Sequence, residues 1–173
     1  EDQTASTDED TALEITLTAT DVDNDNLSFT IVSDVDNGTT SLSGTTVTYT
    51  PNQDWNGTDT FTFNANDGIV DSNISTMTIT VASVNDAPVV EDKSVTIVQN
   101  NSFELDLSAN DVDSSTFTFS IKSNPENGSA SITDNNITYT PNTDFVGDDS
   151  IVYIANDGVL DSNDGTITIS VVN

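Results

Sequence analysis

The chain has 173 residues, with 30 Asp and Glu against 2 Lys and Arg, no His and no Cys, and its formal net charge is −28. Nucleic acids and anionic lipid surfaces are bound through clusters of Lys and Arg, so we expect neither as a partner. Without imidazole or thiol groups the usual zinc sites and thiol nucleophiles are excluded. Carboxylate, amide and hydroxyl oxygens remain, and these ligands suit Ca2+.

Apolar and polar residues alternate along the first half of the chain, which is the pattern of half-buried β-strands. Gly, Pro, Asn and Asp separate the alternating segments, as turns require, and Thr fills many of the polar positions. The pattern predicts short strands, no helix and a β-sandwich. In chain order the apolar positions run over Leu13–Ala19, Leu27–Ile31, Val47–Tyr49, Phe61–Ala65 and Met77–Val81.

The chain contains an internal repeat. Shifted by 90 residues, 1–83 aligns with 91–173 without a gap, and 33 of the 83 pairs are identical. We therefore expect two domains, 1–86 and 87–173, joined by a linker at about 84–88 in which Pro88 restricts the backbone. The chain is expected to be a two-module excerpt of a longer array. No apolar run approaches the roughly 20 residues of a membrane-spanning helix, so membrane insertion is not expected.

Several motifs are spaced along the chain: Glu9-Asp10-Thr11, DVDNDNLSFTI at 21–31, YTPNQDWNGTDTFTF at 49–63, NDG at 66–68 and VNDAP at 84–88. Together they resemble the cadherin-like tandem repeats of very large bacterial surface and secreted proteins. The resemblance covers essentially the whole chain and implies two tandem seven-stranded Ig-like or cadherin-like Greek-key β-sandwiches, an all-β fold. It also implies a calcium-binding linker between the modules.

The resemblance implies a set of calcium ligands at the junction. The linker would supply side chains from Asn85 and Asp86 and backbone carbonyls from Val84 and Ala87. The second module would supply Asp111, Asp113 and Asp157, and the first would supply Glu9 together with Asp54 or Asp59. The spacing leaves those last two as alternatives. An equivalent half-site at the N-terminal end of the first module would consist of Asp21, Asp23 and Asp67.

Two departures from the family pattern affect the ion count. The linker lacks the acidic residue that usually opens it, so the junction is expected to hold fewer ions than a typical cadherin junction. The second module has Gln99-Asn100 where the first has Glu9-Asp10, so its far end is expected to bind calcium more weakly.

Function is expected to follow from the junction. Carboxylates gathered there repel one another without a cation, so the hinge should be flexible without calcium and stiff with it. We expect a monomeric extender or adhesion module pair of a bacterial adhesin or biofilm protein, at the cell surface or secreted, with neighbouring repeats as partners. A carbohydrate-binding or homophilic module is the alternative. Trp55 is matched by Phe145 in the repeat, which favours a packing role over a sugar platform. The carboxylates repeat at turns, so an enzyme is not expected.

Overall fold

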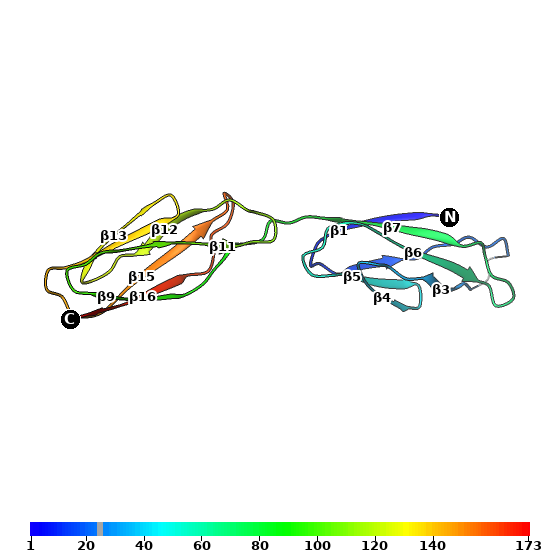
Figure 1. The fold of residues 1–173 in the computed structure, drawn as a ribbon. Helices are drawn as coiled ribbons and strands as arrows, with labels where there is room; N and C mark the ends of the chain where they lie inside the picture. The colour runs from blue at the N-terminus through cyan, green and yellow to red at the C-terminus, as the bar shows by residue number, and fades with distance from the viewer. Residues whose placement is uncertain (24–25) are drawn as a thin grey trace. The chain divides into compact units, whose positions relative to one another are not determined.

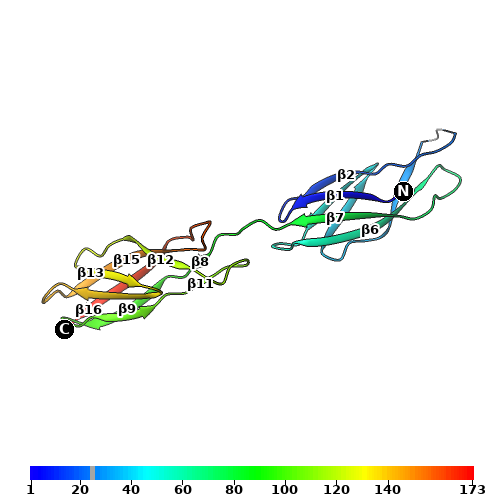
Figure 2. The same ribbon diagram turned by 90° about the horizontal axis from the view of Figure 1, so that it is seen from above.

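The computed structural model describes residues 1–23 and 26–173, so Asn24 and Asp25 of the DVDNDNLSFTI motif lie outside the described residues. The chain divides into two compact units, Glu1–Val84 and Asn85–Asn173, which we call module 1 and module 2 (Figures 1 and 2). The described residues form strands and turns only. Among them there is accordingly no helix of the length and hydropathy needed to cross a bilayer.

Module 1 is a sandwich of a four-stranded and a three-stranded sheet. The first sheet has the order β1-β7-β6-β3 and the second β2-β5-β4. The chain changes sheets after β1, β2, β3 and β5, whereas β4-β5 and β6-β7 are antiparallel neighbours within one sheet, as in a Greek-key sandwich. β1 runs parallel to β7, and the other pairs are antiparallel. The strands are β1 (Gln3–Asp8), β2 (Leu13–Thr16), β3 (Ser28–Ser33), β4 (Gly38–Ser43), β5 (Thr46–Pro51), β6 (Gly57–Asn66) and β7 (Ser75–Ala82).

Module 2 repeats this arrangement and adds one short ribbon. Its sheets have the orders β12-β15-β16-β9 and β10-β14-β13, and β8 pairs with β11. The predicted fold, two tandem seven-stranded sandwiches, is confirmed. The strands are β8 (Val89–Val90), β9 (Lys93–Val98), β10 (Phe103–Asp106), β11 (Ala109–Asn110), β12 (Thr118–Ser123), β13 (Gly128–Thr133), β14 (Asn136–Pro141), β15 (Gly147–Asn156) and β16 (Gly165–Val172).

Each module has its own core, built from the alternate residues of its strands. In β6, Phe61, Phe63 and Ala65 are buried, and beside them in the same sheet the β7 residues Met77, Ile79 and Val81 are buried as well. Trp55 is partly buried against this core, and Phe145 packs in the same way in module 2. Both aromatic residues therefore have the packing role that the repeat predicted.

The alternation from Leu13 to Ala19 extends further than the strand it forms. β2 ends at Thr16, although Leu17 is still buried and its N–H donates to the carbonyl of Thr45 at 2.8 Å. Ala19 is exposed. Its repeat partner, Ala109, pairs with Val90 in the β8-β11 ribbon. The difference at this position thus depends on a neighbouring segment rather than on local pattern.

Candidate functional site

Asp111 lies in the turn that follows β11 and is held by its own backbone. Its Oδ1 accepts hydrogen bonds from the N–H groups of Asp113 and Ser114, both at 2.8 Å. Its Oδ2 is buried and, within the part of the chain that the structure describes, has no hydrogen-bond partner. A buried carboxylate oxygen without a donor is costly unless a cation neutralises it.

The linker residues of module 2 are bonded to the same end of the sandwich. Asn85 Nδ2 donates to Asp157 Oδ2 at 2.7 Å and to the carbonyl oxygen of Asp86 at 2.8 Å. The N–H of Asp86 donates to Asp113 Oδ2 at 2.9 Å. Five of the predicted ligands, Asn85, Asp86, Asp111, Asp113 and Asp157, therefore lie in one connected group within module 2.

Hydrogen bonds keep Asp157 ionised. Its pKa is lowered by the backbone N–H of Leu160, then by the Asn85 side chain and then by the N–H of Val159. The two N–H groups lie 2.7 and 2.6 Å from Oδ1, so Oδ1 is fixed in the turn after β15 and Oδ2 points to the linker residue. A carboxylate held ionised in this way is a suitable ligand for a hard cation.

Module 1 gathers acidic residues around its C-terminal residue. Glu9 is only 4% exposed, and its Oε1 accepts the N–H of Val84 at 2.5 Å. Asp10 Oδ1 accepts the N–H of Asp54 at 3.0 Å, and carboxylate oxygens of these two residues lie within 4.8 Å of each other. Like charges at this separation repel by about 1–4 kcal/mol, depending on how much water surrounds them.

In the equivalent pair of module 2, only one of the two side chains is charged. Asn100 replaces Asp10, and its amide donates to Asp144 Oδ1 at 3.0 Å while its Oδ1 accepts the N–H of Asp144 at 2.9 Å. The amide thus satisfies this carboxylate without a cation. Module 1 has two carboxylates in the same arrangement, which suits a cation between them.

Asp10 is a candidate ligand that the sequence analysis did not assign. The available indication was the exchange of Asp10 for Asn100 between two otherwise similar turns. Both residues have positive φ, 56° and 63°, a conformation that Asp and Asn adopt more readily than most residues. A residue type chosen for a turn thus also carries a charge difference between the modules.

The structure separates Asp54 from Asp59. Asp59 is 3% exposed, and its carboxylate accepts the N–H groups of Asp36, Asn37 and Thr60 and the hydroxyl of Tyr49. Asp149 makes the same four types of bond in module 2. Asp59 therefore anchors the turn before β4 to β6, whereas Asp54 lies beside Asp10.

The predicted half-site at the other end of module 1 has the same local turns. Asp21 Oδ1 accepts the N–H of Asp23 at 2.8 Å. Asp67 Oδ1 accepts the N–H groups of Ile69 and Val70, both at 2.7 Å, and the Val70 and Ile69 bonds lower the pKa of Asp67. The turns are thus formed by the module itself.

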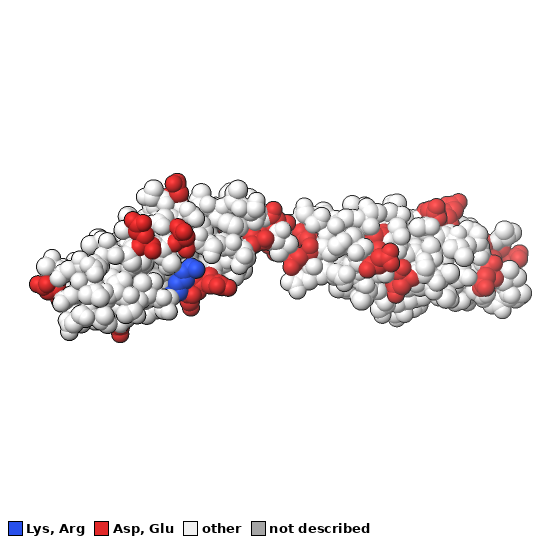
Figure 3. Space-filling model, viewed as in Figure 1, with Lys and Arg blue, Asp and Glu red and all other residues white. Residues whose placement is uncertain are grey.

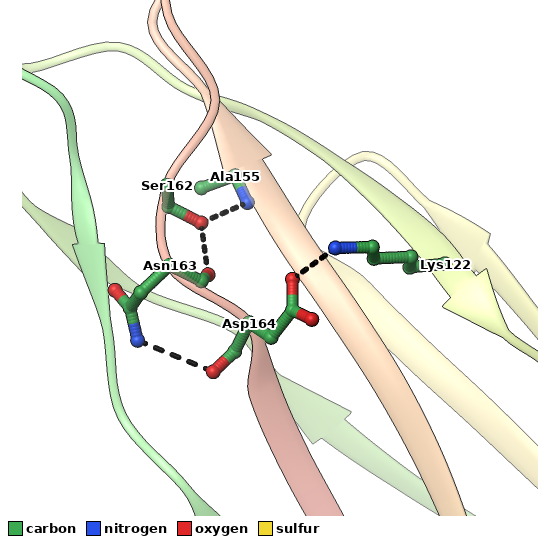
Figure 4. A network of polar contacts seen from close by, with 5 residues as sticks. All are labelled: Lys122, Ala155, Ser162, Asn163 and Asp164. Carbon is green, nitrogen blue, oxygen red and sulfur yellow. Dashed lines mark hydrogen bonds and ion pairs between the residues drawn. The ribbon is translucent and has the colours of Figure 1, made fainter.

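Positive charge is sparse around these groups. Figure 3 shows acidic side chains on the visible faces of both modules and few basic ones. Of the two cations in the sequence, Lys122 pairs with Asp164 at 2.5 Å, with both side chains about half exposed (Figure 4).

Val84 and Ala87, which were predicted to bind calcium through their backbone carbonyls, are both exposed. Carboxylate and carbonyl oxygens of this kind fit a divalent cation.

The chain is similar in fold to cadherin ectodomains. It matches human CDH23 EC21-23 with 17% identity over 91% of this chain and 66% of that chain, at a TM-score of 0.58. It matches mouse Cadherin-23 EC22-24 with 20% identity over 99% of this chain and 62% of that chain, at a TM-score of 0.56. Likeness at these identities shows the fold alone.

A third similarity is to a larger enzyme. An endo-fucoidan hydrolase from glycoside hydrolase family 107 matches with 22% identity over 98% of this chain. The TM-score of 0.42 is too low to support a conclusion about fold or function. The chain spans only 27% of that protein. No curated protein matches the chain.

The sequence profile described as "Bacterial Ig domain" matches residues 1–80 and again residues 85–170. Domains of this family are typically extracellular or surface-associated. The resemblance to bacterial cadherin-like repeats is thereby confirmed. The chain belongs to the bacterial Ig domain family, of which it contains two copies.

Proposed function

We propose that this chain is a calcium-rigidified extender or adhesion segment of a large bacterial surface or secreted adhesin. Ca2+ would bind where the linker at 84–88 joins the two modules. The observation that carries the proposal is the Asp111 carboxylate. One of its oxygens is fixed by two backbone N–H groups, and the other is buried with no hydrogen-bond partner among the described residues.

The ligands on the module 2 side follow from its hydrogen bonds. Asp111 Oδ2 would bind the ion directly, and Asp113 and Asp157 lie in the same connected group. Asn85 and Asp86 offer side-chain oxygens, and Ala87 offers a backbone carbonyl. Ca2+ accepts six to eight such oxygens in flexible geometry, so carboxylate, amide and carbonyl ligands can be combined.

The ligands proposed for module 1 are Glu9, Asp10 and Asp54, with a backbone carbonyl from Val84. We choose Asp54 over Asp59 because both Asp59 oxygens are already occupied by hydrogen bonds within the module. The half-site of Asp21, Asp23 and Asp67 would be a second place for a cation, at the other end of module 1.

The mechanism is electrostatic. Val84 and Asn85 are adjacent in sequence, so ions held by residues on both sides of this bond would resist bending of the linker. Without the ion, carboxylates of one sign would repel and the linker would move more freely. Partners would be neighbouring repeats of the same kind, and the isolated chain would be a monomer without enzymatic activity.

Calorimetric titration with calcium tests the proposal, and Asp111→Asn is the variant of choice. The amide keeps the size of the side chain but removes the charge, and we expect calcium affinity to fall by about tenfold or more. Asp134→Asn is the matched control, because Asp134 is an exposed turn residue of module 2 at φ 55° that also loses one charge. Equal affinities of the two variants would refute the assignment.

Rigidity requires a separate measurement. Small-angle scattering and paramagnetic NMR should show a narrower range of module orientations in calcium than in chelator. If calcium binds but the range is unchanged, the ion has a local role and the extender mechanism fails.

A further inference from the structure

Module 2 has a groove at the edge where its two sheets meet. β12 and β13 each stand at the end of the strand order of their sheet, and the two strands contact each other (Figure 1). The cavity at this edge has a volume of about 450 Å³, which lies in the usual range for small-molecule sites. We call it the module 2 groove and define it by the residues that line it, Phe117, Thr118, Phe119, Ile132, Asp134 and Asn135.

The floor of the groove is apolar and aromatic. Phe117, Phe119 and Ile132 pack against the core of module 2, and each keeps part of its surface exposed. Core packing on one side fixes an aromatic ring, and its open side then offers a rigid apolar surface to a ligand. The groove therefore has a preformed floor.

The rim of the groove is polar and comes from a two-residue turn. Asp134 and Asn135 connect β13 to β14 and follow the last pair of that ladder, Thr133 with Asn136. Both turn side chains are exposed, and within the described part of the chain neither has a hydrogen-bond partner. The turn itself is fixed, because the Asn135 carbonyl accepts the N–H of the buried Leu107 at 2.7 Å. A carboxylate and a carboxamide are thus presented from a rigid support.

The repeat shows that the fold does not require these side chains. Half of the lining positions change in chemical character between the modules, and in module 2 they supply a ring, a carboxylate and a carboxamide. The other half keep their character, with a hydroxyl, a phenyl ring and a branched aliphatic side chain in both modules. The changed positions have Leu27, Gly44 and Thr45 in module 1 and Phe117, Asp134 and Asn135 in module 2.

Asp134 adopts a backbone conformation that favours glycine. Its φ is 55°, and its repeat partner Gly44 has a φ of 62°. A residue with a Cβ atom is less stable than glycine in this left-handed region, although Asp tolerates it better than most. Module 2 thus places a carboxylate where glycine would suit the backbone better, which favours a role for the side chain.

We propose that the module 2 groove binds a neutral sugar ring of a glycan. The C–H groups on one face of a pyranose ring pack against the Phe117 ring, and the hydroxyl groups at its edge bond to Asp134 and Asn135. A carboxylate accepts hydrogen bonds and a carboxamide both donates and accepts them, so neighbouring hydroxyl groups are satisfied together. The formal charge of −28 repels acidic sugars, so the ligand class is neutral. No linker residue takes part, and the site is independent of the calcium proposal.

NMR titration of the full chain in chelator tests this proposal. The probes are methyl galactoside, methyl mannoside and N-acetylglucosamine, each raised to millimolar concentration. At least one of them should shift the amide signals of Phe119 and Asn135 and leave those of their repeat partners, Phe29 and Thr45, in place. No shift with any probe would overturn the proposal, as would equal shifts in both modules.

Two variants introduce the residue that module 1 has at the same position, so the fold accommodates each. Phe117→Leu should weaken binding about fivefold through the lost aromatic contact. Asp134→Gly should weaken it about tenfold through the lost hydrogen bonds to a charged group. Asp148→Thr is the matched control, because Asp148 is exposed on β15, lies outside the groove lining and has Thr58 as its repeat partner.

The control should bind sugar as the unaltered chain does. Unchanged affinity of Phe117→Leu would overturn the proposal, and so would equal losses for Asp134→Gly and Asp148→Thr. Galacturonic acid is the acidic counterpart of the galactose probe, and equal binding of the two would refute the neutral ligand class. Sedimentation that shows a dimer in place of sugar binding would identify a second copy as the occupant and would overturn the proposal too.

Discussion

Replacing Asp59 by Asn changes one atom at a point where four hydrogen bonds converge. Oδ1 accepts the N–H groups of Asp36 and Thr60 at 3.1 and 3.0 Å, and Oδ2 accepts the N–H of Asn37 at 2.9 Å and the Tyr49 hydroxyl at 3.2 Å. Whichever oxygen becomes the amide nitrogen, at least one backbone N–H then faces another donor. The substitution nearly preserves side-chain volume, so packing changes little.

The expected loss follows from these bonds. A buried donor left without an acceptor costs about 1–3 kcal/mol, and the remaining bonds lose the charge of the carboxylate. We expect Asp59→Asn to lower the free energy of unfolding of module 1 by about 2–4 kcal/mol. Against the roughly 5–15 kcal/mol of a typical domain, this is a large fraction.

Urea unfolding followed by Trp55 fluorescence measures this loss. Asp149→Asn is the matched control, because it makes the same change in module 2, which contains no Trp. It should leave the Trp55 transition in place. A loss below about 1 kcal/mol for Asp59→Asn would refute the reasoning, since the convergent bonds would then be dispensable. Lowered calcium affinity with unchanged stability would show instead that Asp59 is a metal ligand and would reverse our choice of Asp54.

Two pH-dependent results are also expected. Burial, followed by the charge and hydrogen bond of Asp59, raises the pKa of Tyr49 from 10.0 to about 12. Its stabilising contribution is therefore complete below about pH 10 and is lost as the pH rises through about 12, which tyrosine absorbance during alkaline titration should show. The backbone N–H of Leu160 and then the Asn85 side chain lower the pKa of Asp157. Asn85→Ala should move that pKa upward in a carboxyl NMR titration, and the stability held by the ionised form should be lost at a higher pH on acidification.

The strands were predictable because burial in a sandwich depends on alternation within each strand. Phe61, Phe63 and Ala65 alternate with polar residues, and all three are buried in β6. Alternation failed at Ala19, where burial depends on whether a separate segment covers the residue. In module 2 that segment is β8, which pairs with Ala109. Local pattern carries no information about such a neighbour.

For the candidate site, the sequence predicted which Asp residues lie in turns. An Asp two residues before another in a turn can accept backbone N–H groups, and Asp111 does so. The sequence could not separate Asp54 from Asp59, because spacing along the chain does not show which carboxylate faces the N–H groups of residues 36 and 37. That assignment depends on the sandwich bringing β6 beside the turn that precedes β4.

Module 1 has Asp10 where module 2 has Asn100, so the two modules differ in their need for a cation at this turn. In module 2, Asn100 and Asp144 satisfy each other through two hydrogen bonds, so an added cation would gain little there. In module 1, the Asp10 carboxylate accepts the backbone N–H of Asp54, and among the described residues the Asp54 carboxylate accepts only the neutral amide of Gln53, so both negative charges stand side by side. Because both turns adopt the same positive-φ conformation, the backbone needs neither residue in particular. The carboxylate at Asp10 therefore adds charge that the turn does not require, and it lies in the module whose last residue, Val84, leads directly into the Asn85-Asp86 linker.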